Sequence, residues 1–269
     1  MSKVVKKRKL KKWVKVFLLI LIIIPSTFFL KDTYSSLKKV TQKINIDNKE
    51  SMNKETTTLN RVTYKDGFYY EELSQKIKLK ITGGSYPKKI NSDFTSISYE
   101  DLSYIKVKYY DFEGVQHNDG EIIVNKTVAQ DIVEIFYKLY LEKYPINSIK
   151  LVEEFDSSDE LSMSANNTTA FSYRKVETED KLSWHAFGLA IDINPLYNPY
   201  VIGNSIYPQN ALKYKDRTLN FEGKINHDNL AYKLFIDYGW KWGGDFTYSK
   251  DYQHFYKEIF DNSIRERKT

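Results

Sequence analysis

The sequence contains no cysteine, and only four of its 269 residues are histidine. The absence of cysteine excludes disulfide bonds, thiolate metal ligands and a thiol nucleophile. It fits a cytosolic protein, and equally an exported bacterial protein that does without disulfides. Glycine and proline are also few, at 11 and 6, whereas 41% of the residues are hydrophobic and 15% aromatic. That apolar content is enough to bury a core, so we expect a folded domain and not a disordered chain.

Positive charge is concentrated at the beginning of the chain. The formal net charge is +6, but eight of the 41 basic residues and no acidic residue lie within Met1–Lys15. The rest of the chain therefore holds 33 basic and 35 acidic residues and is close to neutral. A near-neutral domain does not support a nucleic-acid-binding surface. We expect no nucleic-acid partner, and the sequence identifies no protein partner.

One long hydrophobic run, WVKVFLLILIIIPSTFFL at residues 13–30, follows a basic tail at residues 1–12. Its length is about that of a helix that crosses a bilayer. The positive charges before it predict that the chain beyond it lies outside the cytoplasm. The expected location is a bacterial cell membrane, of the Gram-positive type. No A-x-A-like cleavage site follows, which favours a single-pass transmembrane anchor. The alternative is a cleaved signal segment and a secreted protein.

Beyond this run, the composition predicts three regions. Residues 31–60 are polar without a sustained hydrophobic period and are interpreted as a stalk. A folded domain is expected at residues 61–262 and a short tail at 263–269. Helices and strands in irregular order predict an α+β fold, a small antiparallel sheet with flanking helices that carries one metal site. The expected elements are a hairpin from residues 103–112 and 120–126, helices within 71–84, 127–145 and 228–239, and a polar loop at 156–170.

The four histidines occupy two kinds of neighbourhood. His117 in QHNDG and His227 in NHDN lie among turn-forming residues and are interpreted as surface histidines. His185 and His254 lie in apolar or aromatic stretches, where a buried ionisable ring needs a partner. A lone histidine of that kind is usually a hydrogen-bonded core residue, so further residues must decide its role.

A carboxylate accompanies each of these two histidines. Asp192 follows His185 by seven residues in HAFGLAID, and Asp251 precedes His254 by three in DYQH. A catalytic zinc site needs about three protein ligands and one open position for water. The pattern predicts His185, Asp192 and His254 on one metal ion, with Asp251 beside it as a proton acceptor. On a regular strand Asp251 and His254 would face opposite sides, so the chain must bend between them.

These motifs resemble the zinc D-alanyl-D-alanine carboxypeptidase family, which includes vancomycin-resistance peptidases and the L-alanyl-D-glutamate endopeptidases of endolysins. The family pattern S-x-H-x-x-G-x-A-x-D is met by SWHAFGLAID at residues 183–192. The later acidic-x-x-His-Phe pattern is met by DYQHF at residues 251–255, and an upstream Y-R by Tyr173 and Arg174. The likeness extends from about Val62 to Phe260.

The resemblance implies a zinc peptidase that acts on the stem peptides of peptidoglycan. It implies that His185, Asp192 and His254 hold Zn²⁺, and that Asp251 serves as general base and then as general acid. Many of the family's carboxypeptidases carry Glu where this chain has Asp251, and its endolysin-like branch carries Asp. Asp251 therefore modestly favours the endopeptidase-like relatives, but the sequence does not decide which bond is cut, of carboxypeptidase or endopeptidase type.

Three further residues receive roles from the resemblance. Arg174 would stabilise an oxyanion or bind a substrate carboxylate, and its alternative is a surface ion pair. Ser183 would bind substrate by a hydrogen bond or orient its own loop. Tyr173, next to Arg174, is counted among the substrate-binding residues.

Two other functions are compatible with parts of the sequence. The S-x-x-K motif of serine penicillin-binding enzymes occurs at Ser103/Lys106 and at Ser172/Lys175, but no K-T-G follows, which indicates chance. The other rival is a non-catalytic, zinc-containing module that binds the cell wall or acts as a sensor. An intact Asp251 argues against it, since that residue has no evident part in holding the metal.

Overall fold

The computed structural model describes residue 38 and residues 59–90, 97–176 and 180–259. Contacts divide the chain into a unit Met1–Thr57 and a unit Thr58–Thr269, and the second is described below. The expected basic tail, the hydrophobic segment 13–30, nearly all of the stalk and the C-terminal tail lie outside the described residues, so the domain boundaries stay predictions. Among the residues described, no helix combines the length and the apolar character needed to cross a membrane.

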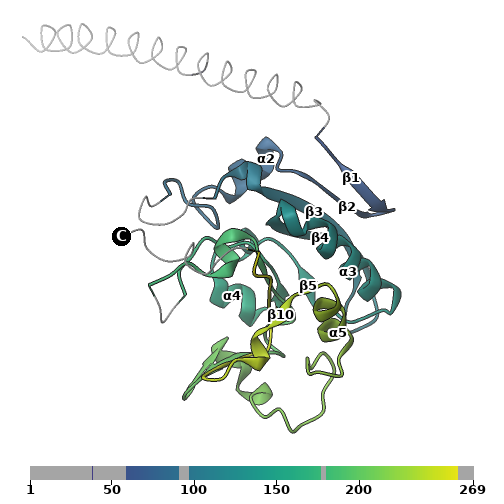
Figure 1. The fold of residues 1–269 in the computed structure, drawn as a ribbon, viewed down its shortest axis with the longest axis vertical. Helices are drawn as coiled ribbons and strands as arrows, with labels where there is room; N and C mark the ends of the chain where they lie inside the picture. Colours follow the sequence, from purple (N-terminus) through teal and green to yellow (C-terminus); the bar gives the residue numbers. More distant parts are fainter. Residues whose placement is uncertain (1–37, 39–58, 91–96, 177–179, 260–269) are drawn as a thin grey trace, which may run out of the picture. The chain divides into compact units, whose positions relative to one another are not determined.

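The first half of the domain is built on a four-stranded antiparallel sheet in the order β1-β2-β3-β4 (Figure 1). The predicted hairpin is confirmed as β3 and β4, joined by a turn at residues 111–115. Ile105 and Val107, two residues apart on β3, are fully buried, as expected for a strand with one face on the core. The strands are β1 (Val62–Lys65), β2 (Phe68–Glu72), β3 (Leu102–Tyr110) and β4 (Gln116–Asn125).

Three of the helices match the sequence pattern. α3 (Ala129–Leu141) buries Ile132, Ile135, Phe136 and Leu139 at helical spacing and packs against β3. The other two are α2 (Gln75–Ile81) and α5 (Leu230–Asp237). α2 ends at an extended Thr82, one residue before Gly83, whereas α5 is followed by Gly239 with φ +77°.

The second half of the domain consists mainly of short strands and 3-10 turns, together with two short helices. Its sheets are β10-β12-β7 and β11-β8-β9, both antiparallel, and a parallel pair β5-β6. The predicted α+β class is confirmed, but the expected single small sheet is divided into several. The strands are β5 (Ser148–Ile149), β6 (Asn167–Thr168), β7 (Ala190–Asp192), β8 (Tyr200–Ile202), β9 (Ser205–Tyr207), β10 (Lys241–Trp242), β11 (Lys250–Asp251) and β12 (His254–Tyr256).

One helix lies where the sequence indicated only a loop. α4 (Asp159–Ser164) begins after Ser158, whose Oγ accepts a hydrogen bond from the Leu161 backbone N–H at 3.3 Å. Ser158 followed by two acidic residues is a usual helix start, a signal that the polar composition of the segment obscured. The 3-10 turns are η1 (Tyr99–Asp101), η2 (Lys126–Val128), η3 (Val152–Phe155), η4 (Trp184–Phe187), η5 (Gln209–Tyr214) and η6 (Gly243–Asp245).

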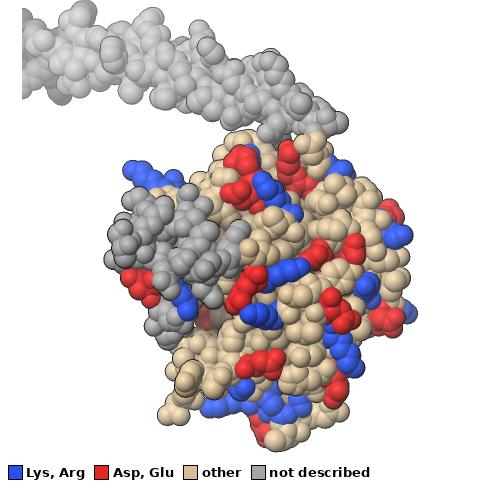
Figure 2. Space-filling view, viewed as in Figure 1, with Lys and Arg blue, Asp and Glu red and all other residues tan. Residues whose placement is uncertain are grey.

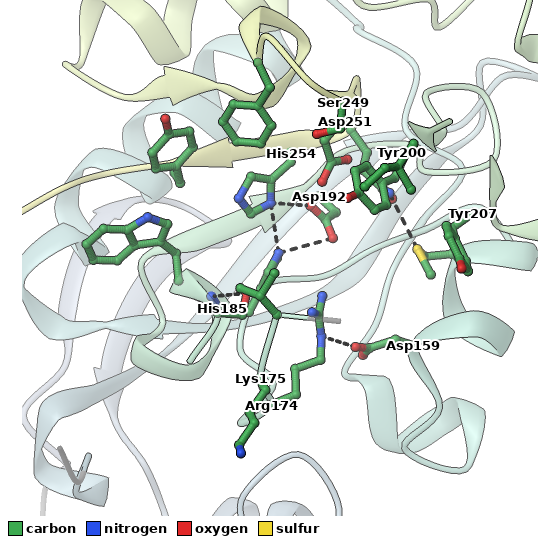
Figure 3. Close-up of a pocket in the computed structure, with 18 of the residues that line it drawn as sticks. Asp159, Arg174, Lys175, His185, Asp192, Tyr200, Tyr207, Ser249, Asp251 and His254 are labelled. Carbon is green, nitrogen blue, oxygen red and sulfur yellow. Dashed lines mark hydrogen bonds and ion pairs between the residues drawn. The ribbon is translucent and has the colours of Figure 1, made fainter. Parts of the chain in front are cut away.

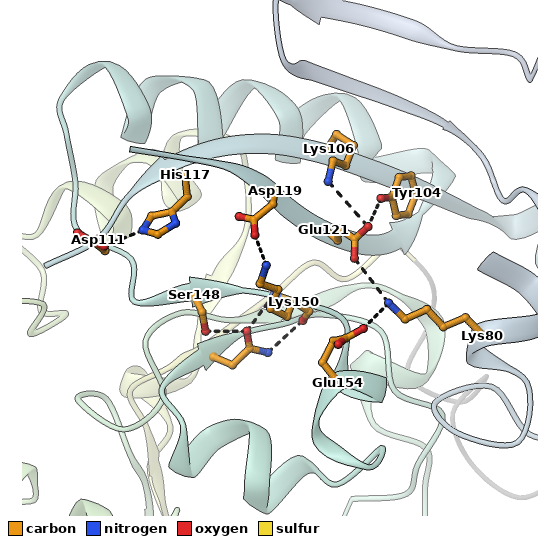
Figure 4. A network of polar contacts seen from close by, with 11 residues as sticks. Lys80, Tyr104, Lys106, Asp111, His117, Asp119, Glu121, Ser148, Lys150 and Glu154 are labelled. Atoms are coloured by element: carbon orange, nitrogen blue, oxygen red, sulfur yellow. Dashed lines mark hydrogen bonds and ion pairs between the residues drawn. The ribbon is translucent and has the colours of Figure 1, made fainter. Parts of the chain in front are cut away.

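Polar contacts join the four-stranded sheet to neighbouring elements (Figure 4). Tyr104 donates a hydrogen bond of 2.5 Å to Glu121, and Lys80 of α2 pairs with Glu154 of η3 at 2.7 Å. Lys80 also lies 3.7 Å from Glu121, so the network runs continuously from the sheet to α2 and η3. On the face seen in Figure 2, basic and acidic side chains are interspersed, as the near-neutral composition predicts.

Candidate metal centre and active site

The first candidate ligand, His185, lies on the short turn η4. Ser183 precedes the turn, and its Oγ accepts a hydrogen bond from the His185 backbone N–H at 3.3 Å. Gly188 ends the turn with φ +65°, and a Cβ there would lie 2.4 Å from the backbone nitrogen of Asn125. Only glycine fits this close approach, so the turn rests directly on the end of β4.

The other two candidate ligands are neighbours on paired strands. β7 and β12 run antiparallel, and their register places His254 opposite Asp192. Directly opposed residues share one face of a sheet, so both side chains point to the same side. The His254 Nδ1 atom lies 3.0 Å from Asp192 Oδ1. β12 also pairs with β10, through Phe255 and Tyr256, so the strand that carries His254 is the central one of its sheet.

His185 completes a compact group with these two residues (Figure 3). Its Nε2 atom lies 3.0 Å from His254 Nδ1 and 3.3 Å from Asp192 Oδ2. All three residues are buried, and their candidate ligand atoms lie within 4.8 Å of one another. Ligands placed tetrahedrally at zinc bond lengths of about 2.0–2.2 Å are separated by roughly 3.4 Å, so the spacing fits a metal ion.

The hydrogen bonding of His185 also suits metal binding. Its Nδ1 atom lies 2.5 Å from the Ala170 carbonyl oxygen, which can only accept a hydrogen bond. Nδ1 therefore carries the proton, and the Nε2 lone pair faces His254 and Asp192. A backbone carbonyl on the outer nitrogen is the usual way in which proteins orient a histidine ligand.

Asp192 supplies the negative charge of the group. Burial acts to raise the pKa of its carboxyl, but His185 and His254 outweigh burial and hold the pKa well below its ordinary value. The carboxylate is therefore ionised at neutral pH. A buried anion needs a compensating charge or hydrogen bonds, and a divalent cation between the three side chains would provide that charge.

Asp251 is brought to the same place by a bend in the chain. β11 pairs with β8, whereas β12 belongs to the sheet with β7, and bend residues Tyr252 and Gln253 lie between them. The bend that the sequence requires is thus confirmed. The Asp251 Oδ1 atom is buried and has no hydrogen-bond partner among the described residues. Burial raises the pKa of Asp251 to about 7, a value suited to exchanging protons near neutral pH.

Gly243 makes this bend possible, and the sequence reasoning did not single it out. A Cβ at Gly243 would lie 2.7 Å from the Asp251 carbonyl oxygen and 2.8 Å from the Asp251 Cβ. It would also lie 3.2 Å from the Cβ of His254. The glycine pair in GWKWGGDF was visible as a signal, but its meaning depends on a long-range contact.

A cavity of about 1010 Å³ opens onto the group. His185, Asp192, Asp251 and His254 all line it, together with Ser183. The cavity therefore joins the candidate ligands to a space large enough for a peptide.

Arg174 also lines the cavity, and its Nε forms an ion pair with Asp159 of α4. The sequence raised an ion pair as one role for Arg174 but did not identify Asp159 as the partner. In Figure 3 the guanidinium end of Arg174 points toward Asp192. Tyr173 is not among the cavity-lining residues, and its ring packs against the hydrophobic core. Its hydroxyl group is buried without a hydrogen-bond partner in the described part of the chain, so contact with substrate stays a prediction.

The two remaining histidines lie elsewhere. His117 pairs with Asp111 at 2.6 Å and stacks on Tyr109, while His227 pairs with Asp245 at 2.8 Å. The His227 side chain is 65% exposed and that of His117 34%. Neither belongs to the candidate metal group.

Comparison with protein families gives one match. Residues 177–257 fit the family described as D-alanyl-D-alanine carboxypeptidase. This segment contains all three candidate ligands as well as Ser183 and Asp251, whereas Tyr173 and Arg174 precede it. Comparison with curated proteins and with solved structures gives no match. The resemblance drawn from the motifs is therefore confirmed over this segment: residues 177–257 match the model of the D-alanyl-D-alanine carboxypeptidase family.

Proposed function

We propose that the protein is a zinc-dependent peptidase that hydrolyses the stem peptides of peptidoglycan, as a D-alanyl-D-alanine carboxypeptidase or an L-alanyl-D-glutamate endopeptidase. The family match supports the substrate class. The observation that carries the proposal is the buried group of His185, Asp192 and His254, which opens onto a large cavity beside Asp251, whose buried Oδ1 atom has no hydrogen-bond partner among the described residues.

The three ligands have distinct tasks in this proposal. His185 and His254 supply nitrogen lone pairs, and Asp192 supplies a carboxylate that offsets part of a divalent charge. These three residues would hold a zinc ion, which when bound would lower the pKa of a water molecule to about 7 and polarise the carbonyl of the scissile bond. The hydrogen bond from His185 Nδ1 to Ala170 keeps that ring in the orientation for binding.

Asp251 acts as the proton carrier. Its buried carboxylate takes a proton from the attacking water and later returns it to the amine that leaves. A pKa of about 7 allows both transfers near neutral pH, because neither the acid nor the base form is strongly favoured.

Arg174 and Ser183 bind the substrate in this scheme. The ion pair with Asp159 fixes the Nε of Arg174, and the far end of the guanidinium turns toward the reacting centre, where it can donate to a substrate oxygen. Ser183 Oγ accepts from the His185 backbone and still has its own hydroxyl proton to donate to a peptide carbonyl.

The proposal includes a tether. Residues 13–30 anchor the enzyme in the membrane and residues 31–60 act as a stalk, with the catalytic domain on the outer side. Mass measurement of the protein recovered from cell membranes tests this arrangement. A full-length mass in the membrane fraction supports the anchor, and a shortened chain in the medium supports cleavage and secretion.

The deciding experiment replaces the proton carrier. Asp251→Asn keeps the side-chain shape but removes the base, so turnover should fall by about 10²–10⁴-fold while bound zinc is retained. Asp245→Asn, at an exposed aspartate paired with His227, is the control and should leave turnover unchanged.

Mass spectrometry of muropeptides digested by the zinc-loaded protein provides the measurement. Release of a terminal D-Ala identifies a carboxypeptidase, and a cut after L-Ala identifies an endopeptidase. Equal turnover by the wild type and Asp251→Asn would refute the role of Asp251. Absence of any cleavage by the zinc-loaded wild type would favour the non-catalytic wall-binding or sensor module.

A further inference from the structure

Arg217 lies between β9 and α5, outside the cavity lining, and binds only neutral groups. Its Nη1 donates to the Tyr197 carbonyl oxygen at 2.8 Å, and its Nη2 donates to Asn198 Oδ1 at 3.0 Å and to the Ile225 carbonyl oxygen at 2.9 Å. Within the described ranges, no carboxylate pairs with it. A partly buried cation without an anionic partner is costly, so its position calls for a physical reason.

The guanidinium of Arg217 lies over the ring of Tyr252, with its carbon atom 4.3 Å from the ring centroid. Tyr252 is one of the two bend residues between Asp251 and His254. Burial lowers the pKa of Arg217 to about 10, so the group stays charged at neutral pH and the cation–π attraction persists. The charge of Arg217, which has no anionic partner among the described residues, therefore acts on Tyr252, the residue next to the proposed base Asp251.

Two further contacts hold Tyr252 through its backbone. The Trp242 indole Nε1 donates to the Tyr252 carbonyl oxygen at 2.9 Å, and the Tyr252 N–H donates to the Pro199 carbonyl oxygen at 3.4 Å. Asn198, which accepts from Arg217, also donates to the Ile193 carbonyl oxygen at 3.4 Å, one residue after the ligand Asp192. Arg217 thus links the chain that follows Asp192 to the bend before His254.

We infer that Arg217 is a positioning residue, which orients Asp251 toward the substrate by clamping the ring of Tyr252. Its effect on turnover rests on the proposed function, but its effect on the bend does not. Asp251 depends on this clamp more than His254 does. His254 pairs with Asp192 of β7 and lies on the central strand of its sheet, between β7 and β10, whereas Asp251 lies on the two-residue edge strand β11, which pairs with β8.

The test compares Arg217→Met with Lys224→Met in the full-length, zinc-loaded protein. Lys224 donates to the carbonyl oxygens of Arg217 at 2.6 Å and Leu219 at 2.9 Å, so its loss loosens the same segment without removing the contact with Tyr252. We expect Arg217→Met to lower kcat by about 10–100-fold, as displacement of a reacting group does, with little change in KM or zinc affinity. Lys224→Met should leave kcat near the wild-type value.

A second measurement does not depend on catalysis. The Trp242 indole N–H resonance in ¹H–¹⁵N spectra reports on the Tyr252 carbonyl that it contacts. We expect this resonance to shift in Arg217→Met and to stay in place in Lys224→Met, while the Trp240 resonance moves in neither. If the wild type cleaves no peptide, the proposed function fails, and the resonance still decides the inference.

Arg217→Lys covers the case in which Arg217→Met does not fold. Lysine keeps the charge but loses the planar fork, so it should give the same resonance shift and a smaller loss of kcat. The inference is overturned if the Trp242 resonance of the folded Arg217 variant is unmoved, or if both variants at positions 217 and 224 lower kcat equally.

Discussion

The two halves of the domain use different kinds of structure. The first half, residues 59–145, has strands of up to ten residues and a thirteen-residue helix whose buried positions follow a regular period. The second half, residues 146–259, has strands of two or three residues joined by 3-10 turns and bends. Most of the buried polar side chains belong to the second half, namely Ser162, Asn166, Asn167, Thr168, Ser183, His185, Asp192, Asn194, Asn198, Gln253 and His254.

This difference shows how an irregular backbone can be tolerated around a site. A buried peptide group that has no partner in a helix or sheet must find one in a side chain. Asn198 is the main example, because it donates to three carbonyl oxygens and accepts from Arg217 and from the Ile225 N–H. The regular half provides the apolar core, and the irregular half places the candidate ligands.

The largest effect is expected from removing a ligand in the irregular half. His254→Ala should abolish zinc binding and lower turnover by more than the roughly 10–100-fold typical of losing an outer partner of a metal ligand. Elemental analysis together with a peptide-release assay measures both. His227→Ala, at the exposed histidine, is the control and should change neither quantity. Retention of zinc and turnover by His254→Ala would contradict the claim that the irregular half places the metal ligands.

A core substitution in the regular half should lower stability and leave turnover per folded molecule unchanged. Ile105→Ala removes a fully buried side chain from β3, so the free energy of unfolding should fall by about 2–5 kcal/mol. Turnover per folded molecule should stay near the wild-type value, because Ile105 lies away from the cavity lining. Denaturant unfolding measures the first quantity and a kinetic assay below the transition the second. A large loss of turnover without loss of stability would contradict the division between the halves.

A smaller effect is expected at Gly243, which packs against the bend between Asp251 and His254. Gly243→Ala forces apart the new Cβ and the backbone of Asp251, so turnover should fall by roughly 10–100-fold through misplacement of Asp251, the proposed proton carrier. Gly203→Ala is the matched control, since a Cβ there meets nothing within 4 Å. Its φ of +55° should cost about 1–2 kcal/mol of stability and leave turnover unaffected. Equal activities of Gly243→Ala and Gly203→Ala would show that the bend accommodates a Cβ at position 243, against the close packing of Gly243 on Asp251.

The smallest effect concerns a contact between α3 and Tyr238, the residue that follows α5. The Tyr238 hydroxyl donates to Glu134 at 2.6 Å, and this bond, with another from Gln130, holds the pKa of Glu134 below its ordinary value. The stabilisation is therefore present above the ordinary glutamate pKa and is lost as the pH falls through the lowered one. Tyr238→Phe should cost less than about 1 kcal/mol at pH 7, and the difference should shrink at pH 3. A difference that grows on acidification would contradict this sign.

The sequence was informative where the signal is local or periodic. The β3–β4 hairpin and α3 followed from their hydrophobic spacing, and the close grouping of His185, Asp192 and His254 from their motifs. The bend at Tyr252 followed from the three-residue spacing of Asp251 and His254. In each case the residues that carry the signal are close together along the chain.

Long-range packing accounts for what the sequence did not predict. Helix α4 was hidden by its polar composition, and the pairing of its Asp159 with Arg174 joins segments fifteen residues apart. The need for glycine at Gly243 appears only when Asp251 lies against it. The part played by Arg217 appears only when its segment packs over Tyr252, because no local pattern distinguishes a clamping arginine from a surface one.

The central claim is that His185, Asp192 and His254 together hold one divalent ion, and a zinc titration tests it most directly. Metal-depleted full-length protein should bind one zinc ion per chain, with an equal stoichiometry in Asp251→Asn. Replacing any one of the three ligands by alanine should weaken that binding strongly. If the ligand variants bound zinc as tightly as the wild type, or if the wild type bound none, the proposed metal centre would be contradicted.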